Sequence, residues 1–295
     1  MSEKTVFVLH RKSANEEYVK EAVKTVRKEG HKFRVLVPFN KKEKPRVVRE
    51  ALKKGVKRII AGGGDGTINA VANALIKYGG KNSDVTLGIC PLGTANDFAR
   101  GLELPRDDLA ECLRIACTRE GRSIDVGVLN NRHFINVASL GFGAEITATT
   151  PIQLKKALGG GAYTLMGLIK ALNLTPYPGQ LLVPGEEPVE GSMLFMAVGN
   201  NHFAGGGFDI APQAKLDDGR LDLTAILVGR GFNLAGIRDE LENPMNPNNK
   251  HVYYRQLSEF TIKSEQKLHC NLDGEPIHKK QLRFSILPNR LQVAY

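Results

Sequence analysis

Apolar residues follow two rhythms along the chain. Up to about Asn130, short apolar runs alternate with segments in which apolar residues recur every three or four positions, and this pattern predicts alternating strands and helices. The helices end at breakers such as Gly30 and Gly55. We expect residues 1–131 to form a doubly wound α/β domain. Its predicted strands are residues 6–9, 33–37, 58–61, 85–90 and 123–128.

Beyond Arg132 the apolar runs are short and are separated by turns. Such clustering of strands predicts an all-β domain, a β-sandwich over residues 132–285, with a site in the cleft between the two domains. The predicted strands are residues 133–139, 192–198, 221–228, 251–255, 259–263, 267–272, 282–287 and 291–294.

One helical segment, residues 151–174, interrupts these strands. It combines an apolar face with bordering lysines and a break at Gly159–Gly161. Such a face suits a membrane interface, and it equally suits packing against the protein's own core. We expect no transmembrane segment, because no stretch has the required length and hydropathy, and no secretory signal.

A glycine-rich turn follows the predicted strand at 58–61. Residues 62–66 read GGGDG, and apolar spacing predicts a helix from about Thr67. Glycines let the backbone approach an anion closely, and a helix N-terminus offers unpaired N–H groups, so the turn suits phosphates. Its spacing is neither that of a Walker A loop nor G-x-G-x-x-G. A tight strand-to-helix turn without a ligand is the structural alternative.

A second polar loop follows the predicted strand at 85–90. Residues 91–100 read PLGTANDFAR. The carboxyl ends of parallel strands meet at one edge of a sheet, where open α/β sheets bind ligands. Asn96 and Asp97 also suit helix capping, and capping is compatible with a binding role.

These two loops and the late segment NLDGEP at 271–276 together resemble the diacylglycerol-kinase-type lipid kinases, most closely the bacterial YegS-like lipid kinases. The similarity runs over nearly the whole chain. NAD kinases and phosphofructokinases resemble the GGDGT element alone, so PLGTAND and LDGEP make the resemblance specific. It implies the same two-domain architecture, with residues 286–295 returning to the first domain.

Composition adds a basic surface to this interpretation. The chain has 295 residues and a net charge of +10, and residues 41–58 hold nine Lys or Arg against two Glu. Such a surface favours an anionic membrane and nucleotides, although an ordinary solvated helix face has the same pattern. Nucleic acid is not an expected partner, since no nucleic-acid-binding motif is present. The scattered cysteines predict no zinc site and fit a reducing cytoplasm.

Phosphoryl transfer from ATP to an alcohol requires positioned phosphates, a divalent ion and a base near the attacking hydroxyl. Backbone N–H groups and threonine hydroxyls are suitable donors to phosphates, and Asp65 can organise a magnesium ion or its water. The resemblance assigns nucleotide binding to Gly64, Asp65, Gly66, Thr67, Ile68, Asn69, Ala70 and Thr94.

Glu275 is the predicted base, because the glutamate of LDGEP is the proton acceptor in the resembling kinases. Asp273-Gly274 is also a strong hairpin signal, and a hairpin tip can serve both purposes. The predicted catalytic residues are therefore Glu275 and Asp65.

A loop at residues 211–221 resembles a family loop that holds a structural magnesium through residues matching Lys215, Asp218 and Arg220. Lys and Arg side chains cannot ligate a cation, so these two contribute only backbone carbonyls, and Asp218 is the predicted side-chain ligand. We expect Mg²⁺ there, with Ca²⁺ as a substitute. Asp217 and Asp218 as turn residues before a strand are the alternative.

Three positions depart from the YegS-like pattern and bear on nucleotide affinity and choice. Pro38 stands where those kinases have a nucleotide-contacting Thr. His10 replaces an expected Asn, although Lys12 is retained, and Ala70 replaces an acidic residue.

The leading hypothesis is a cytoplasmic, membrane-surface kinase that transfers the γ-phosphate of ATP to a lipid, either phosphatidylglycerol or a diacylglycerol-like acceptor. One alternative is an NAD-kinase-like phosphotransferase with a soluble acceptor, against which PLGTAND and LDGEP argue. Another is a non-catalytic regulator that binds nucleotide or lipid. The presence of Asp65 and Glu275 argues against a regulator, whereas Pro38 and Ala70 keep it open.

Overall fold

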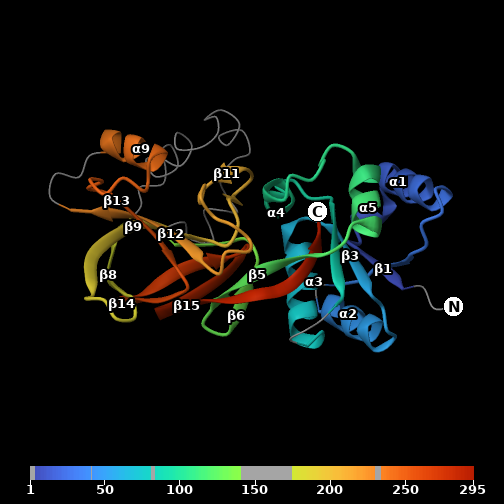
Figure 1. Ribbon diagram of the computed structural model, residues 1–295, viewed down its shortest axis with the longest axis horizontal. Helices are drawn as coiled ribbons and strands as arrows, with labels where there is room; N and C mark the ends of the chain where they lie inside the picture. The colour runs from blue at the N-terminus through green and yellow to red at the C-terminus, as the bar shows by residue number, and fades with distance from the viewer. Residues whose placement is uncertain (1–3, 41, 81–83, 141–174, 230–233) are drawn as a thin grey trace. The chain divides into compact units, whose positions relative to one another are not determined.

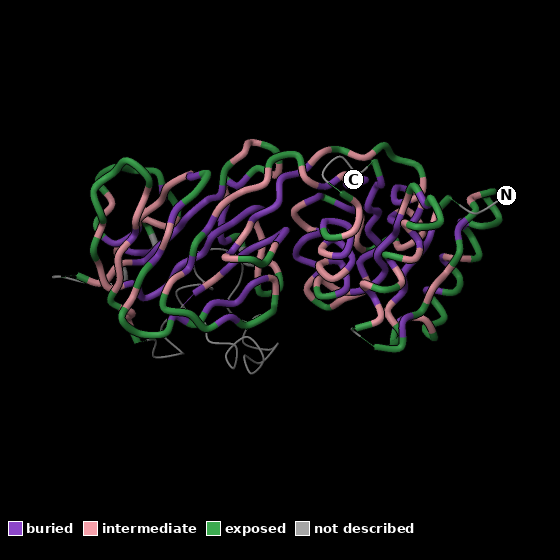
Figure 2. The backbone as a smooth tube through the Cα atoms, turned by 90° about the horizontal axis from the view of Figure 1, so that it is seen from below, coloured by how far each residue is buried: buried purple, intermediate pink, exposed green. Residues whose placement is uncertain are grey.

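The computed structural model describes residues 4–40, 42–80, 84–140, 175–229 and 234–295. The chain forms two compact units (Figure 1): residues 1–126 together with 288–295 are unit 1, and residues 127–287 are unit 2. The predicted helical segment at 151–174 lies outside the described residues. In unit 1 the buried positions are shared between strands and helices, whereas in unit 2 they lie mostly on strands (Figure 2).

Unit 1 is built on a parallel sheet. The strand order is β2 (Arg34–Leu36), β1 (Thr5–Leu9), β3 (Arg58–Gly63), β4 (Thr86–Pro91) and the final residues of β15 (Glu275–Ala294). Each neighbouring pair in this order is parallel. Strand β5 (Arg122–Leu129) also pairs with β15.

Helices cover both faces of this sheet (Figure 1). Helices α1 (Glu17–Lys28) and α5 (Leu109–Thr118) pack on one face, and α2 (Glu43–Lys53) and α3 (Asp65–Tyr78) pack on the other. Side chains alternate along a strand, so Phe7 of β1 joins the core beneath α1 and α5. Unit 1 therefore has the doubly wound α/β fold that the sequence predicts. The short elements are η1 (Ser13–Asn15) and α4 (Asp97–Gly101).

Unit 2 is an all-antiparallel β structure. Strand β8 pairs with both β14 and β9, β6 pairs with β5, and β10 pairs with β11. The main order is β13 (Val252–Leu257), β12 (Leu221–Val228), β9 (Val189–Gly199), β7 (Val137–Leu140), β14 (Glu259–Leu272) and β15. The other elements are β6 (Arg132–Phe134), β8 (Tyr177–Leu182), β10 (Phe203–Ala204), β11 (Phe208–Asp209) and α9 (Leu234–Glu242).

Strand β9 is buried on both of its faces. Met196 belongs to one hydrophobic cluster and Phe195 to another. The second cluster includes Ile237, so α9 covers that side of the sheet. Two buried faces explain why the sequence of β9 is apolar without strict alternation.

The structure joins some predicted strands and divides another. Residues 259–263 and 267–272 form one strand, β14, and a register shift between Lys263 and Leu268 absorbs the polar residues between them. The predicted strand at 133–139 is instead two strands, β6 and β7. Strand β8 and helix α9 were not predicted. Within the described residues, no helix has the length and apolar character needed to cross a bilayer.

Candidate functional site

The two polar loops of unit 1 lie against each other where β3 and β4 end. A Cβ built on Gly93 would come within 2.5 Å of the Gly64 Cα atom, a distance that real side chains do not adopt. The Leu92 N–H donates to the Gly63 carbonyl at 2.9 Å. The loops therefore meet through their backbones, and glycine is required at their point of contact.

Asp65 forms a second link between the loops. Its Oδ1 accepts a hydrogen bond of 3.1 Å from the Phe98 N–H, at the start of α4. Asp65 is also the first residue of α3, two positions before the predicted start at Thr67, where the helix dipole favours a negative charge. The structure thus gives this predicted catalytic residue a contact that shapes the site.

Asn96 holds the second loop in shape. Its Oδ1 accepts from the Gly93 N–H and its Nδ2 donates to the Gly93 carbonyl, both at 2.8 Å. Asn96 occupies the N-cap position of α4, as the capping alternative expects, but its side chain makes no cap hydrogen bond and instead closes the loop. Its backbone takes φ +50°, a left-handed conformation that Asn tolerates. Thr94 lies in this closed loop with its side chain exposed.

The glycines of the first loop have different tasks. A Cβ on Gly62 would approach the Phe7 ring to 2.3 Å, and one on Gly63 would approach the Thr67 side chain to 2.6 Å, so both glycines are required by packing. A Cβ on Gly66 would meet nothing within 4 Å. Gly66 therefore leaves open space at the N-terminus of α3, where a ligand can approach the backbone.

The rest of the predicted nucleotide-binding stretch faces inward or is half-buried. Ile68 is fully buried, so only its backbone is available to a ligand. The Asn69 side chain is occupied in part, since its Oδ1 accepts from Asn73 Nδ2 at 2.6 Å. Ala70 is half-buried on the first turns of α3.

Lys44 is a site residue that the sequence reasoning missed. Its Nζ donates to Thr67 Oγ1 at 3.0 Å, and Lys44 is only 5% exposed. In the sequence, Lys44 is one of nine Lys and Arg residues in the basic segment at residues 41–58. Its spacing to Val48 and Ala51 was the available signal, because positions i, i+4 and i+7 share one helix face and both of those residues are buried.

His10 brings β1 into the same region. Its backbone N–H donates to the Gly62 carbonyl at 2.7 Å. Burial lowers the pKa of His10, and the positive charges of Lys44 and Lys12 lower it further. Basic side chains from two segments, the residues after β1 and helix α2, therefore gather beside the glycine-rich loop.

Glu275 of unit 2 lies at the start of β15, directly after a tight turn. Asp273 and Gly274 take φ values of +47° and +89°, as the Asp-Gly hairpin signal predicts. The Gly274 N–H donates to Asn271 Oδ1 at 2.7 Å. Glu275 itself is exposed, so its carboxylate is accessible to a substrate.

Asp273 anchors this turn to the segment before β7. Its carboxylate accepts hydrogen bonds from the backbone N–H groups of Ile135, Asn136 and Val137, at 2.8, 3.2 and 3.0 Å. Hydrogen bonds to a charged acceptor are stronger than neutral ones. Asp273 therefore fixes the position from which Glu275 projects.

The predicted metal-binding residues lie in the loop before β12. Asp218 Oδ1 accepts from the Arg220 N–H at 3.0 Å, and Gly219 takes φ +71°. Asp218 therefore stabilises a turn, as the structural alternative expects. No group of three or more His, Cys, Asp and Glu side chains gathers within metal-binding distance in the described ranges.

Comparisons with known proteins give the family of the chain. Residues 4–129 match the Diacylglycerol kinase catalytic domain, and residues 136–295 match the YegS C-terminal NAD kinase beta sandwich-like domain. A relative named "Probable lipid kinase YegS-like" in Chromohalobacter salexigens is 44% identical over 295 residues, 98% of this chain and 92% of that protein. This chain belongs to the YegS-like lipid kinase family.

Other relatives extend the match. A "Probable lipid kinase YegS-like" protein of Shewanella frigidimarina is 37% identical, over 97% of this chain and 91% of that protein. A crystal structure of a diacylglycerol kinase from Bacillus anthracis str. Sterne aligns with a TM-score of 0.75 at 20% identity, over 99% of this chain and 97% of that one, and shows the shared fold.

In this YegS-like chain, a buried carboxylate lies near the predicted metal loop. Asp222 is fully buried; its Oδ1 accepts from the Tyr254 hydroxyl and from Gln256 Nε2, the latter at 3.2 Å. Its Oδ2 has no hydrogen-bond partner in the part of the chain that the structure describes. Burial raises the pKa of Asp222, and the negative charge of Asp218 raises it further.

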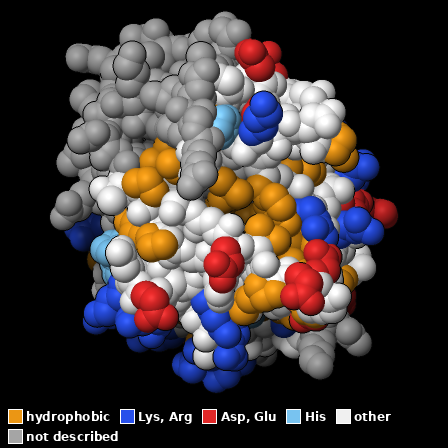
Figure 3. Space-filling view, turned by 90° about the vertical axis from the view of Figure 1, so that its left-hand side faces the viewer, with side chains coloured by type: hydrophobic (Ala, Val, Ile, Leu, Met, Phe, Trp, Pro, Cys, Tyr) orange, Lys and Arg blue, Asp and Glu red, His pale blue; other side chains and the backbone are white. Residues whose placement is uncertain are grey.

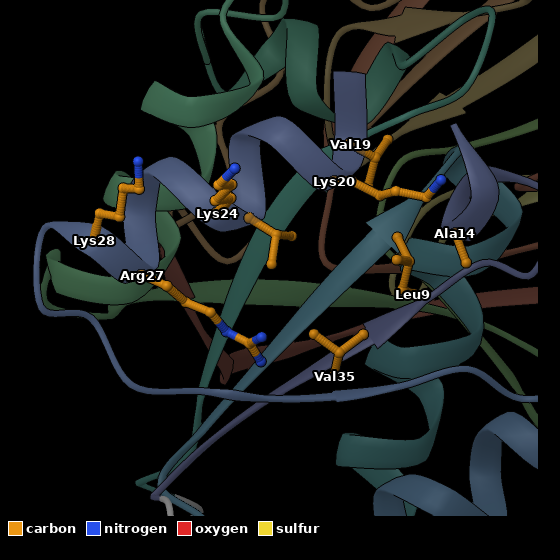
Figure 4. A pocket seen from close by; sticks show the side chains of 9 residues that line it. Leu9, Ala14, Val19, Lys20, Lys24, Arg27, Lys28 and Val35 are labelled. Atoms are coloured by element: carbon orange, nitrogen blue, oxygen red, sulfur yellow. The ribbon is translucent and has the colours of Figure 1, made fainter. Parts of the chain in front are cut away.

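Unit 1 also contains a pocket of about 470 Å³ beneath α1 (Figure 4). Its floor is apolar, and Arg27 reaches across it toward Val35. No acidic or histidine side chain lines it, so it lacks a base for phosphoryl transfer, and we do not assign the site to it. The pocket is lined by Leu9, Ala14, Val19, Lys20, Val23, Lys24, Arg27, Lys28 and Val35.

Proposed function

We propose that this member of the YegS-like lipid kinase family transfers the γ-phosphate of ATP to a lipid hydroxyl, with phosphatidylglycerol or a diacylglycerol-like lipid as acceptor. The contact between Gly64 and Gly93 is the observation that carries the proposal. It joins two strand-end loops into one backbone surface at the N-terminus of α3, and such a surface binds phosphates.

The residues of this surface fit the phosphates of a nucleotide. Gly66 leaves room for an anion to approach, and the first N–H groups of α3 are suitable donors. Thr94 is exposed and offers a hydroxyl. ATP, when bound, supplies the phosphoryl group. The residues that would hold it are Gly64, Asp65, Gly66, Thr67, Ile68, Asn69, Ala70 and Thr94.

We propose Glu275 as the general base. An exposed carboxylate can accept the proton of a lipid hydroxyl while the hydroxyl oxygen attacks the γ-phosphorus of ATP. Asp273 and Asn271 hold the turn and so restrict where Glu275 projects. Asp65 is proposed to organise Mg²⁺ or its water beside the phosphates while keeping the two loops linked.

A structural divalent ion fits the loop before β12. The Asp218 carboxylate would ligate it together with the backbone carbonyls of Lys215 and Arg220. Asp222 supports this assignment, because its buried Oδ2 lacks a hydrogen-bond partner among the described residues and Asp218 adds negative charge nearby. Hard oxygen ligands and local negative charge favour Mg²⁺, with Ca²⁺ as a substitute.

We further propose that the protein works in the cytoplasm, in peripheral contact with an anionic membrane. The face seen in Figure 3 presents apolar side chains in its middle, and below them basic side chains along the lower edge together with several acidic ones. Apolar groups beside Lys and Arg are the combination that lies at a lipid interface.

A labelling experiment tests the function. The purified full-length protein is incubated with γ-labelled ATP, Mg²⁺ and mixed micelles of single lipids, with NAD as a soluble acceptor and Glu275→Gln as control. We expect label in one lipid class and its loss in the variant. Label in NAD alone would instead support a soluble-acceptor kinase, and ATP binding without any transfer would support a regulator.

A further inference from the structure

The paired loops of unit 1 contain a single cation. Residues 62–76 and 91–99 include no Lys or Arg, and Arg100 closes the second loop. Nucleoside triphosphates carry several negative charges, and phosphoryl-transfer sites in other folds place a lysine on the β- and γ-phosphates. A lysine from another segment would add positive charge beside the first loop, which has none.

Lys44 is placed to supply that cation. It lies in the first turn of α2, and its Nζ reaches Thr67 Oγ1 in the first turn of α3, at 3.0 Å. Thr67 is held in turn by its N–H, which donates to the Gly64 carbonyl at 2.8 Å. The ammonium group therefore lies one side chain away from the loop that meets Gly93.

Burial favours this role. Removing an ammonium group from water costs free energy, so a buried lysine is an uncommon feature of a helix. A phosphate beside Lys44 would interact with the buried charge through a medium that screens it weakly. The charges of Lys44 and Lys12, which after burial lower the pKa of His10, show that the potential in this region is positive.

We propose that Lys44 binds the β- and γ-phosphates of the nucleotide, in a role that rests on the proposed ATP-binding function. Thr67 orients the Lys44 ammonium toward the open space above Gly66. The basic segment at residues 41–58 is then divided between an exposed face and one cation committed to the site.

Nucleotide titration calorimetry with the full-length protein and Mg²⁺ tests this proposal. ATP, ADP and adenosine are titrated into wild type, Lys44→Met and Lys53→Met. Lys53 is the matched control, because it lies on the same helix with its side chain 64% exposed. We expect Lys44→Met to lower the affinity for ATP by about tenfold or more and the affinity for ADP by less, with the affinity for adenosine unchanged. Lys53→Met should retain wild-type affinity for all three.

A structural role alone predicts a different pattern. An equal loss of affinity for ATP and adenosine in Lys44→Met, or wild-type ATP affinity in that variant, would overturn the proposal while leaving the proposed function intact. Failure of the wild type to bind any nucleotide would overturn the proposed function itself. If Lys44→Met does not fold, Lys44→Gln replaces it, since Gln keeps a hydrogen-bond donor without the charge and is expected to show the same selective loss for ATP.

Discussion

The paired loops of unit 1 are shaped by backbone contacts, whereas the turn before Glu275 in unit 2 is shaped by side chains. Gly93 must lack a side chain for its loop to meet Gly64. The turn before Glu275 depends instead on the carboxylate of Asp273, which accepts three backbone N–H groups. A backbone-shaped site is broken by adding atoms, and a side-chain-shaped site is broken by removing them.

The roles that we propose for the two regions account for the difference. A phosphate group is met best by clustered N–H groups, which require close approach of the backbone. A proton acceptor must instead be a side chain, held in place but accessible. Substitutions in the two regions should therefore fail in distinguishable ways.

The largest effect is expected from Glu275→Gln. Glutamine has the size of glutamate but cannot accept the proton, so kcat should fall by about 10²–10⁴-fold. Transfer of labelled phosphate to the preferred lipid measures this. Because Glu275 is exposed, the thermal midpoint should not change. A variant that keeps at least a third of the wild-type rate would remove Glu275 from the mechanism.

The next effect is expected from Gly93→Ala. The new methyl group would lie 2.5 Å from the Gly64 Cα atom and force the loops apart. We expect a loss of about 1–3 kcal/mol in the free energy of unfolding, measured by denaturant titration. Gly66→Ala is the matched control, because its methyl group meets open space and α3 tolerates alanine. Equal stability of the two variants would contradict the backbone account.

Asp273→Asn should have a smaller effect. Asparagine keeps one acceptor oxygen but loses the charge that strengthens the hydrogen bonds to residues 135–137. We expect a loss of about 1–2 kcal/mol in the free energy of unfolding and a lower kcat, with unchanged ATP affinity. Asp217→Asn, an exposed acid of the same unit, serves as control. If both variants behave alike, Asp273 does not anchor the turn.

The smallest effect concerns His10. Its lowered folded-state pKa means that the unfolded chain binds more protons below about pH 6.5, so stability is lost as pH falls from there through the folded pKa. Removing the Lys44 charge in Lys44→Met should raise the pKa of His10, and stability should then fall less between the two pKa values. NMR titration of the imidazole measures the shift, and an unchanged pKa would separate Lys44 from His10.

Periodicity predicted the parts of the fold that depend on local pattern. Strands and helices alternate in unit 1, and the Asp273-Gly274 turn follows from local backbone preference. The continuous strands β14 and β15 were not predicted, because the polar residues within them resemble turns and only pairing across the sheet keeps them extended.

Long-range contacts explain what the sequence did not reveal about the site. The meeting of the loops was expected from the sheet topology. The burial of Lys44 was not, because it depends on the packing of α2 against α3, and Lys44 and Thr67 are 23 residues apart in the sequence. Asparagine is a residue type that often caps helices. The Asn96 backbone is left-handed, however, and its side chain forms hydrogen bonds with Gly93. The contact of Asp273 with residues 135–137 likewise requires the folded sheet.

The affinity for Mg²⁺-ATP of Gly93→Ala and Glu275→Gln, measured side by side by calorimetry, tests the central claim most directly. We predict that Glu275→Gln binds ATP as the wild type does, although its kcat is about 10²–10⁴-fold lower, and that Gly93→Ala binds ATP weakly. Wild-type ATP affinity in Gly93→Ala, or lost ATP affinity in Glu275→Gln, would contradict the assignment of phosphate binding to the paired loops of unit 1.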